Sequence, residues 1–484
     1  MPEHATPTLL SPNSVLANAL LRTIDMLRPR VHESRPERIE FVVGTQINGV
    51  PHLGTNLVQS AAFLLAQQAR SVFRTETTVR FAALDNAPYD IALDPKSGHD
   101  YQKTYFHALT EQGVAELIGT YYRPFFDSLA AATDIEYVTE TYTQQQAGAG
   151  FRAEFLRTLE VAEDLRWWLN PSTGVVHTRI PCPSCGWAEK RAERTQLVRL
   201  DDEGALFTSV CQDHGEYESY IDPTDGAYLD LATLYRNVVK ERAFTRDATT
   251  LHVMLKGGDW AGGCQLVDGA LEALGTPGRQ MSVRIFTPQV LSDTGGKLSK
   301  SLIRAAGGLQ CVPGSEPWML STIEWPGSTD QFVDSLLWLV RHLLSDPKHF
   351  FRSFTAQELG RLMASRPPQI GNTPRVRDMP IYKQYYDLIA DGTKTIEVRV
   401  AYTSMQKIKE GDRIRFTCRG DGTLTRVKRV ARYKSFDEMF EHEAVEAINP
   451  KATREEQLKA IRQIFPKEKE ALGVLAIEVE KVAS

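Results

Sequence analysis

Cysteine is scarce in this sequence, with 6 residues among 484. So few cysteines in so long a chain exclude a disulfide-stapled secreted scaffold. Apolar runs are short too, and none approaches the roughly 20 residues that a membrane-spanning helix needs. The first residues lack the charged start, apolar stretch and small-residue cleavage site of a secretory signal. These absences predict a cytoplasmic protein without a membrane partner.

An excess of positive charge is also missing. Lys and Arg number 56 against 61 Asp and Glu, a formal net charge of −5. This balance argues against a globally basic nucleic-acid binder. A local basic run does occur, and two interpretations of it carry equal weight: an RNA-binding patch, or the solvated faces of paired strands. Its members are Lys407, Lys409, Arg413, Arg415, Arg419, Arg426, Lys428, Arg429, Arg432 and Lys434.

The length of the chain predicts two or three domains, because one hydrophobic core rarely serves so many residues. Residues 1–35 form a polar arm and a helix from Val15 to Leu27 that ends before Pro29. A catalytic domain over 36–345 and a helical segment with a linker over 346–374 follow. The linker prediction rests on the proline-rich, polar stretch 365–377. Residues 375–484 alternate like a small β-rich domain.

The proposed catalytic domain opens with a strand–helix–strand unit. Apolar runs predict strands at Ile39–Val43 and Val79–Leu84, and a helix begins near His52 and continues to about Ala69. This arrangement is the building block of a parallel, doubly wound α/β sheet. Further buried strands are predicted at 251–255 and 283–286.

The turn into the first helix reads Pro51-His52-Leu53-Gly54-Thr55-Asn56. Free N–H groups at a helix start attract phosphate. A glycine at Gly54 lets a nucleotide approach the backbone, and His52 can hydrogen-bond phosphate oxygens as negative charge shifts. A turn histidine that only caps the helix is the alternative. Combined with two later segments, this turn predicts that His52, Gly54 and Asn56 bind ATP, with His52 acting in catalysis.

Two later segments complete a predicted nucleotide site. Gly295-Gly296-Lys297-Leu298-Ser299-Lys300-Ser301 follows the last strand, and its lysines Lys297 and Lys300 suit a mobile clamp that neutralises pyrophosphate. Ser299 and Ser301 are predicted to contact ATP beside them. Lys256-Gly257-Gly258-Asp259-Trp260 ends an apolar strand, as ligand-contacting loops of α/β sheets do, although a simple turn is the alternative.

Together, the HLGT and KLSKS segments resemble the HIGH and KMSKS signatures of class I aminoacyl-tRNA synthetases, and most closely the class I lysyl enzymes. The resemblance implies a Rossmann-type HUP domain that forms an acyl-adenylate from ATP, with Mg2+. It also assigns Gly257, Gly258 and Asp259 to ATP or substrate. Thr55 replaces the second histidine of the signature, and the anticodon-binding region is missing or reduced to residues 315–360. These departures indicate a paralogue with a changed acceptor.

The resemblance further implies an amino acid or other carboxylate as substrate, and a tRNA, another RNA, a nucleoside or a small metabolite as acceptor. Lysyl enzymes place acidic residues near the end of the second strand to hold substrate amines. Asp85 and Asp90 are the candidates here, with turn formation as the alternative. Two rival functions stay open: a nucleotidyltransferase of the same superfamily, and a regulator that binds RNA through the C-terminal domain.

A metal site is predicted within the insertion at 180–220. Cys182 and Cys185 are followed, after 25 intervening residues, by Cys211 and His214. Two such pairs supply four ligands for tetrahedral Zn2+ and leave no open position, so we predict a structural zinc ribbon. A disulfide between the first pair is the alternative, and it leaves Cys211 and His214 unexplained.

The C-terminal segment from Ile389 to Arg399, IADGTKTIEVR, ends a helix with a glycine and enters a charged strand. Alternation places Thr395, Glu397 and Arg399 on one face of that strand. The segment resembles the ASCH domain, a small β-barrel related to RNA-binding PUA modules. In ASCH enzymes that deacetylate acetylcytidine, a lysine and a glutamate form the catalytic pair, which the resemblance carries to Lys394 and Glu446.

The family's threonine corresponds to Glu397 in this chain, which departs from the deacetylase pattern. A binding role is the alternative to hydrolysis. In it, Lys394, Glu397 and Arg399 contact a nucleoside or an RNA phosphate. An exposed charged strand is the third reading.

Overall fold

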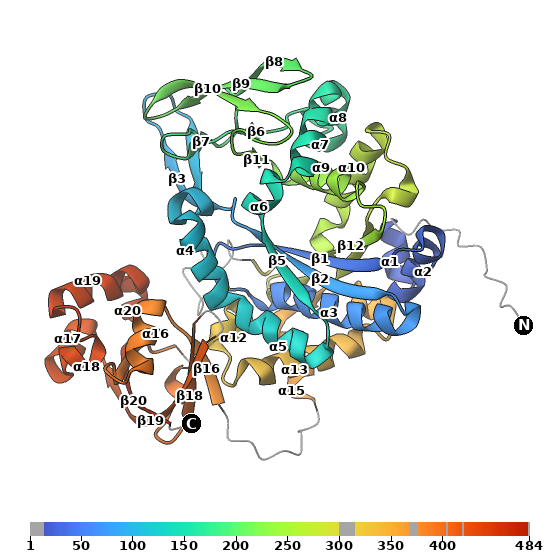
Figure 1. Ribbon diagram of the computed structural model, residues 1–484. Helices are drawn as coiled ribbons and strands as arrows, with labels where there is room; N and C mark the ends of the chain where they lie inside the picture. Colours follow the sequence, from blue (N-terminus) through green and yellow to red (C-terminus); the bar gives the residue numbers. More distant parts are fainter. Residues whose placement is uncertain (1–13, 300–314, 367–375, 403–404, 419–420, 483–484) are drawn as a thin grey trace, which may run out of the picture.

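The computed structural model describes residues 14–299, 315–366, 376–402, 405–418 and 421–482. The predicted site residues Lys300 and Ser301 lie outside these ranges. Figure 1 shows a large α/β domain and a smaller C-terminal domain at its side. Within the described ranges, no helix is both long and apolar enough to cross a membrane.

The large domain is built on a parallel sheet of five strands, in the order β13-β12-β1-β2-β5. The predicted parallel α/β sheet is therefore confirmed. The apolar runs that signalled these strands are buried on both faces, as parallel sheets require. The strand bounds are β1 (Arg38–Gln46), β2 (Glu76–Leu84), β5 (Tyr137–Thr141), β12 (Thr250–Gly257) and β13 (Val283–Thr287).

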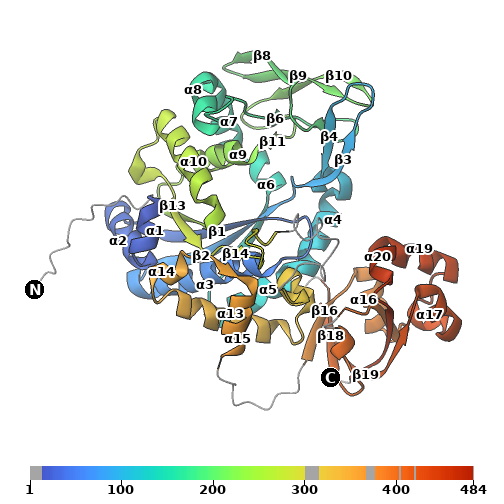
Figure 2. The ribbon, with the colours of Figure 1, turned by 180° about the vertical axis from the view of Figure 1, so that it is seen from behind.

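Helices cover both faces of this sheet (Figures 1 and 2). On one side lie α3 (Leu53–Phe73), α5 (Arg123–Thr133) and α13 (Thr329–Leu343), and on the other α9 (Thr233–Phe244) and α10 (Ala261–Ala273). Aromatic rings fill the space under the sheet, with Phe81 stacked on Phe126 at 4.5 Å between centroids. Burying each such ring stabilises the fold by roughly 2 kcal/mol.

The N-terminal helix differs from its prediction. Two helices, α1 (Val15–Leu20) and α2 (Thr23–Ser34), replace the single helix expected from Val15 to Leu27, and Pro29 lies inside α2. An internal proline costs a helix roughly 3 kcal/mol. Packing offsets that cost here, since Met26 and Leu27 are buried and Arg30 donates to the carbonyl of Gly278 at 3.0 Å.

Three small antiparallel sheets and a group of helices rise above the main sheet in Figure 1. The sheets are β3-β4-β7, β10-β9-β8 and the pair of β11 (Asp230–Leu231) with β6 (Thr178–Arg179). Their bounds are β3 (Pro88–Leu93), β4 (Asp100–Thr104), β7 (Trp187–Glu189), β8 (Gln196–Asp201), β9 (Gly204–Cys211) and β10 (Gly215–Ile221). The neighbouring helices are α4 (Tyr105–Tyr121), α6 (Tyr142–Ala147), α7 (Ala149–Glu160) and α8 (Ala162–Leu169).

Short elements follow the last strand of the main sheet. A bridge joins β14 (Val290–Leu291) to β15 (Phe354–Thr355) in parallel. The helices of this region are α12 (Pro317–Leu320), the 3-10 turn η3 (Thr322–Glu324), α14 (Pro347–Phe350) and α15 (Ala356–Ala364).

The C-terminal domain is a curled, half-barrel sheet in the order β16-β18-β19-β20-β17. It is thus an open form of the predicted barrel. Its two edge strands, β16 and β17, are linked by the Arg399 side chain, which donates a hydrogen bond to the carbonyl of Pro380 at 3.3 Å. Its strands are β16 (Val376–Pro380), β17 (Ile396–Val400), β18 (Arg413–Cys418), β19 (Asp421–Tyr433) and β20 (Val474–Lys481). Its helices are α16 (Lys383–Ala390), α17 (Phe436–His442), α18 (Val445–Ile448), α19 (Arg454–Ile464) and α20 (Lys467–Glu470).

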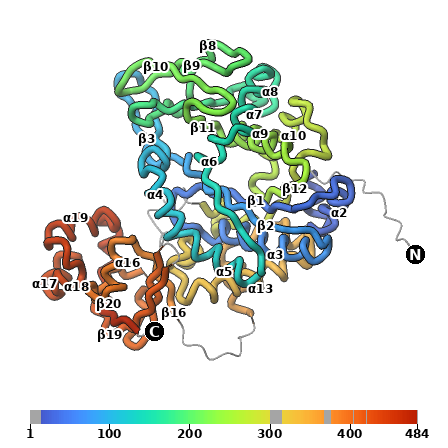
Figure 3. Tube along the Cα trace, viewed as in Figure 1, coloured from blue at the N-terminus to red at the C-terminus, as the bar shows by residue number. Residues whose placement is uncertain are grey.

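The tube in Figure 3 shows β16 passing beside the large domain where the two domains meet. One hydrogen bond across this boundary runs from the backbone N–H of Thr329 to the Asp378 carboxylate, at 2.7 Å. Each domain keeps its own hydrophobic core, so the boundary joins two separately packed units.

Candidate functional site

The predicted nucleotide segments meet at one edge of the main sheet. Strands β1 and β12 are parallel neighbours, with Val43 opposite Leu255. The turn to α3 follows β1, and a 3-10 turn, η1 (Gly258–Trp260), follows β12. Chain connections leave β1 toward β2 on one side and reach β12 on the other, so this edge is a topological switch point. Ligands of open α/β sheets bind at such points.

His52 is the N-cap residue of α3 and has extended backbone angles. Its Nε2 lies 3.4 Å from the hydroxyl of Thr55. A Cβ on Gly54 would lie 3.1 Å from the imidazole Cε1, so glycine leaves the space that the ring uses. The N-terminus of the helix and this imidazole therefore face the same region, as the phosphate-binding prediction requires.

Asn56, the third residue predicted from this turn, is placed differently. Its side chain is fully buried, and its amide donates to Oε1 of Gln59 at 3.3 Å. Gln59 donates in turn to Thr45 at the end of β1, also at 3.3 Å. In this arrangement Asn56 fastens the start of α3 to the sheet, one layer below the surface on which His52 lies.

An ion pair joins the other two predicted segments. The Lys297 ammonium contacts the Asp259 carboxylate, and their side chains are 45% and 23% exposed. Asp259 lies in η1, where a Cβ on Gly257 would come within 2.6 Å of its Oδ1. Lys297 lies on a tight hairpin, closed by the bond from Leu298 N–H to the Val290 carbonyl at 2.8 Å. Within the part of the chain that the structure describes, the lysine is thus partly exposed and pairs with one carboxylate, for which a ligand can compete.

Behind this pair lies a buried group that the sequence reasoning missed. The Lys256 ammonium lies 4.7 Å from the ring centroid of Trp260 and donates to Asn237 at 3.1 Å. Lys240 donates to the same amide oxygen at 2.9 Å. Burial lowers the pKa of both lysines. No local sequence motif pointed to Lys240 or Asn237.

Asp85 and Asp90, the predicted amine ligands, differ in burial and in hydrogen bonding. Asp90 is exposed on β3 and accepts from the backbone N–H of Ile91. Asp85 is 1% exposed, and its Oδ1 accepts from the N–H of Thr143 at 3.1 Å. Its Oδ2 has no hydrogen-bond partner among the described residues, and burial raises its pKa. A buried carboxylate with one free oxygen is suited to a cationic ligand group.

The predicted metal ligands converge. The ligand atoms of Cys182, Cys185, Cys211 and His214 lie within 4.8 Å of one another. Cys185 and Cys211 sulfurs are 3.4 Å apart, and the Cys211 sulfur is 3.6 Å from His214 Nδ1. Tetrahedral zinc with Zn–S bonds of about 2.3 Å spaces its ligands by about 3.8 Å. Three thiols and an imidazole at this spacing fit zinc.

In the C-terminal domain, Lys394 is buried in a closed set of acceptors. Its ammonium donates to the carbonyls of Ile396 at 2.6 Å and Ile448 at 2.9 Å, and lies 3.3 Å from the Glu397 carboxylate. The second oxygen of Glu397 pairs with Arg399 at 3.0 Å. Burial lowers the pKa of Lys394, while Glu397 opposes that shift.

Glu446 does not join this cluster. It is exposed on α18, and no ion pair or hydrogen bond between described residues links it to Lys394. Glu397, which the sequence analysis treated as a departure from the deacetylase pattern, is the carboxylate that the lysine contacts. The three N–H donors of the ammonium are all used, so this lysine has no free donor for a substrate.

Three members of the basic run on β18 and β19 form ion pairs between described residues. Arg429 contacts both Glu478, at 2.9 Å, and Glu443, at 2.8 Å. Lys428 lies 3.9 Å from Glu478, and Arg415 lies 3.6 Å from Asp378. The antiparallel register that sets Arg429 opposite Glu478 brings these charges together. The pairing explains these three residues as parts of solvated strand faces, and both interpretations of the other members of the run stay open.

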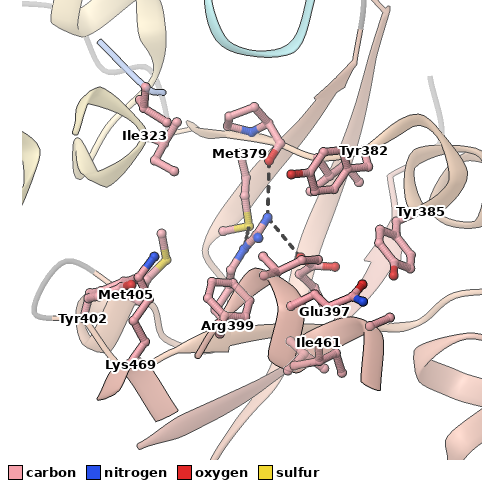
Figure 4. Close-up of a pocket in the computed structure, with 18 of the residues that line it drawn as sticks. Ile323, Met379, Tyr382, Tyr385, Glu397, Arg399, Tyr402, Met405, Ile461 and Lys469 are labelled. Carbon is pink, nitrogen blue, oxygen red and sulfur yellow. Dashed lines mark hydrogen bonds and ion pairs between the residues drawn. The ribbon is translucent and has the colours of Figure 1, made fainter. Parts of the chain in front are cut away.

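A cavity of about 550 Å3 lies between the two domains, and we call it the interdomain cavity. The large domain lines it with Gly49, Val50, Tyr121, Ile323 and Glu324. The C-terminal domain lines it with Tyr382, Tyr385, Lys394, Glu397, Arg399 and Tyr402. Figure 4 shows Ile323 entering from the large domain, opposite Glu397 and Arg399. Sequence reasoning found the charged trio and missed the rest, since the other residues carry no local motif.

Residues 379–483 match the ASCH domain family. The solution structure of a Pyrococcus furiosus protein is 34% identical over 22% of this chain and 99% of its own, with a TM-score of 0.21. Among curated proteins, no sequence matches this one.

Similarity to solved synthetases extends over more of the chain at low identity. A putative arginyl-tRNA synthetase from Campylobacter jejuni covers 70% of this chain and 71% of its own, at 10% identity and a TM-score of 0.27. A Mycobacterium tuberculosis methionyl-tRNA synthetase bound by methionyl-adenylate covers 68% of each chain, at 11% identity and a TM-score of 0.32.

Proposed function

The chain belongs to the ASCH family through residues 379–483, and we propose that this domain is joined to an enzyme that activates a carboxylate with ATP. The observation that carries the proposal is the meeting of three segments at one switch point of the parallel sheet. They are the helix start at His52, the loop bearing Asp259 and the hairpin bearing Lys297.

The proposed first step is adenylation. A carboxylate oxygen of the substrate attacks the α-phosphorus of ATP, and the bond from that phosphorus to the pyrophosphate oxygen breaks. The helix start and the imidazole of His52 hydrogen-bond phosphate oxygens where negative charge grows. Asp259 accepts from the ribose hydroxyls, and its ion pair with Lys297 opens. The freed ammonium then neutralises the leaving pyrophosphate.

Two metals accompany this proposal. Magnesium would accompany ATP and neutralise part of the phosphate charge. Cys182, Cys185, Cys211 and His214 would hold zinc, which would join β9 and β10 to the segment before β7. Four protein ligands leave no position for a substrate, so the zinc site is structural.

The free oxygen of buried Asp85 supports an amino acid as the carboxylate. A carboxylate buried beside Tyr228 and Phe106, whose rings stack at 5.5 Å, suits an ammonium group. We propose that Asp85 binds the amine of the substrate, and that the adenylate passes its acyl group to an RNA, nucleoside or small-molecule acceptor.

The test is exchange of labelled pyrophosphate into ATP, measured with the full chain and a library of amino acids and other carboxylates. Exchange that depends on one carboxylate supports adenylation. Transfer of AMP to a phosphate-bearing acceptor without any carboxylate would instead identify a nucleotidyltransferase of the same superfamily. Absence of both reactions, with RNA binding retained, would identify a regulator.

A further inference from the structure

A second group of metal-ligating side chains lies at the sheet β3-β4-β7, apart from the four predicted zinc ligands. His99 directly precedes β4, Glu189 is the last residue of β7, and Glu193 follows in the next turn. One ligand atom from each lies within 4.8 Å of the others. Neither the predicted zinc site nor the proposed adenylation uses these three residues.

The strand register brings these side chains together. Strands β4 and β7 are antiparallel, with Tyr101 opposite Glu189. Because side chains alternate along a strand, His99 lies on the same face as Tyr101, and therefore on the face of Glu189. After β7, the backbone N–H of Ala192 donates to the Glu189 carbonyl at 3.1 Å, and this tight turn returns Glu193 to His99. Two segments far apart in the sequence thus form one cluster.

The carboxylate of Glu189 is the strongest sign of a bound ion. This side chain is 1% exposed, and its Oε1 has no hydrogen-bond partner among the described residues. His99 Nδ1 lies 2.8 Å from that oxygen, yet the geometry between the two atoms is not that of a hydrogen bond. A buried carboxylate oxygen without a partner is unfavourable. A cation beside both atoms would satisfy them, because each can donate a lone pair to it.

The other oxygen of Glu189 is held from outside the cluster. Its Oε2 accepts from the backbone N–H and from Nε of Arg194, both at 3.2 Å. Arg194 also donates to the Tyr101 hydroxyl at 2.5 Å. Metal-binding carboxylates are oriented in this way, by hydrogen bonds to the oxygen that does not bind the ion. Arg194 is therefore a positioning residue for Glu189.

The donor atoms indicate the class of cation. An imidazole nitrogen with two carboxylate oxygens suits zinc and other first-row transition metals, whereas magnesium and calcium prefer oxygen ligands. Nδ1 of His99 lies 2.8 Å from Glu189 and 3.6 Å from Glu193. Zinc bonds of about 2.1 Å in tetrahedral geometry separate two such ligand atoms by about 3.4 Å. Within the described ranges, Glu193 forms no ion pair with a lysine or an arginine that would compete with a metal.

We propose that His99, Glu189 and Glu193 bind a second divalent transition-metal ion, of the class of zinc. Three protein ligands leave one coordination position open. His99 and Glu193 are 29% and 50% exposed, so water or an anionic ligand can reach that position. The ion joins the loop before β4 to the turn after β7, and it exchanges more readily than zinc held by four protein ligands. This inference does not depend on the proposed adenylation.

Binding is tested on the full chain, purified and dialysed against metal-free buffer, by titration with Co2+ and visible absorption. One equivalent is expected to give the weak visible bands of nitrogen and oxygen ligands, without the strong near-ultraviolet absorption that thiolates add. Zn2+ should displace this Co2+, and Mg2+ should not. Hydrogen exchange over 94–101 and 187–195 should slow as the site fills, because the ion joins these segments.

Two variants with matched controls identify the ligands. Glu193→Gln changes an exposed residue and should weaken Co2+ binding at least about tenfold, since even the outer partners of a metal contribute ten- to a hundredfold. Its control is Glu203→Gln, at another exposed glutamate of the same insertion, which should leave binding unchanged. Glu189→Gln should weaken binding at least as much. Its control is Glu154→Gln, because Glu154 is also 2% exposed and pairs with Arg242 away from the cluster.

Three results would overturn the proposal. If Co2+ binds nowhere, or binds only with thiolate absorption, the cluster is an ion-pair network of His99 between two carboxylates. Equal affinity in the Glu193→Gln and Glu203→Gln proteins would place the ion elsewhere. Displacement by Mg2+ as effective as that by Zn2+ would show a non-selective acidic surface. Glu193 is exposed, so its variant keeps the test decisive even if Glu189→Gln fails to fold.

Discussion

Lys297 and Lys394 are both lysines that the sequence marks as functional, and the structure gives them opposite surroundings. Lys297 is 45% exposed, and its ion-pair partner among the described residues is the Asp259 carboxylate, at the proposed nucleotide site. Lys394 is 4% exposed and has two carbonyls and a carboxylate around its ammonium. We call the partners of Lys297 an open set, because the exposed cation can leave them for the anion of a ligand. We call those of Lys394 a closed set, because they surround the buried ammonium and hold it in place as part of the fold.

The Cys/His cluster belongs with Lys394 in this comparison, because its four ligand atoms face one another. The largest expected loss of stability follows from removing the metal from this cluster. Purified protein should hold one zinc per chain. Cys182→Ser combined with Cys211→Ser should release it, at a cost on the order of 10 kcal/mol of metal-linked folding energy in the insertion. Metal analysis and hydrogen exchange over 180–221 measure both effects.

Cys264→Ser is the control for the zinc prediction, since Cys264 is a buried cysteine outside the cluster. That variant should keep its metal. A wild-type protein that contains no metal, yet melts like the same protein supplied with zinc, would contradict the prediction.

The second effect tests the closed set around Lys394. Lys394→Met leaves the Glu397 carboxylate buried without its lysine, which should destabilise the C-terminal domain by about 3 kcal/mol. Native-state hydrogen exchange on β17 and β20 measures that loss. Lys297→Met should change stability by less than about 0.5 kcal/mol, as surface substitutions do. If both substitutions changed the stability equally, the buried lysine would contribute no more to the fold than the exposed one.

A double variant sharpens this result. In Lys394→Met the Glu397 carboxylate still pairs with Arg399 at 3.0 Å, and adding Glu397→Gln leaves that guanidinium without its carboxylate, so the double variant should be less stable than Lys394→Met alone. Equal stability of the single and double variants would mean that the pair between Glu397 and Arg399 contributes nothing.

The third prediction tests whether the exposed Lys297 acts in pyrophosphate exchange. Lys297→Ala should slow pyrophosphate exchange about a hundredfold, the scale of losing one preorganised charge contact, while ATP affinity changes far less. Lys96→Ala, at an exposed lysine on the loop after β3, is the matched control. Normal exchange by Lys297→Ala would show that the lysine is no part of the clamp.

The smallest effect is a dependence on pH. Burial lowers the pKa of Lys394 from its usual value of 10.5. Between the lowered pKa and 10.5, the unfolded chain binds a proton that the folded domain does not, so stability should rise with pH across that window. The difference in stability between wild type and Lys394→Met should therefore grow as pH rises toward 10.5. A constant difference would show that the buried lysine keeps its ordinary pKa.

The parallel sheet was predictable because its strands are buried on both faces. Runs such as Ile39–Val43 and Val79–Leu84 are apolar apart from Glu40 and Arg80, which pair with each other at 2.8 Å. The glycine turn between the runs needs no tertiary information. The HLGT and GGDW loops follow such strands directly, so their meeting at one edge also follows from chain order. The ion pair between Asp259 and Lys297 does not, because a hairpin brings together residues 38 apart.

Contacts between sheets and between domains could not be predicted from the sequence for the same reason. Alternation correctly placed Glu397 and Arg399 on one face of β17. The choice of Glu446 as partner for Lys394 depended on the orientation of α18, which only the packed domain fixes. Arg429 pairs with Glu478 through a strand register that no local pattern reveals. Tyr121 and Glu324 enter the cavity from separate segments, and neither lies in a motif.

The shared walls of the interdomain cavity also constrain how this chain can change over evolutionary time. A substitution at Ile323 alters the space available on the side of Tyr382 and Tyr402, although these residues fold in a different domain. Such positions are expected to vary together among homologues that keep both domains. A recombination event that replaced the C-terminal domain with that of a more distant relative would join one half of the cavity lining to an unmatched half, and both halves would then have to adapt.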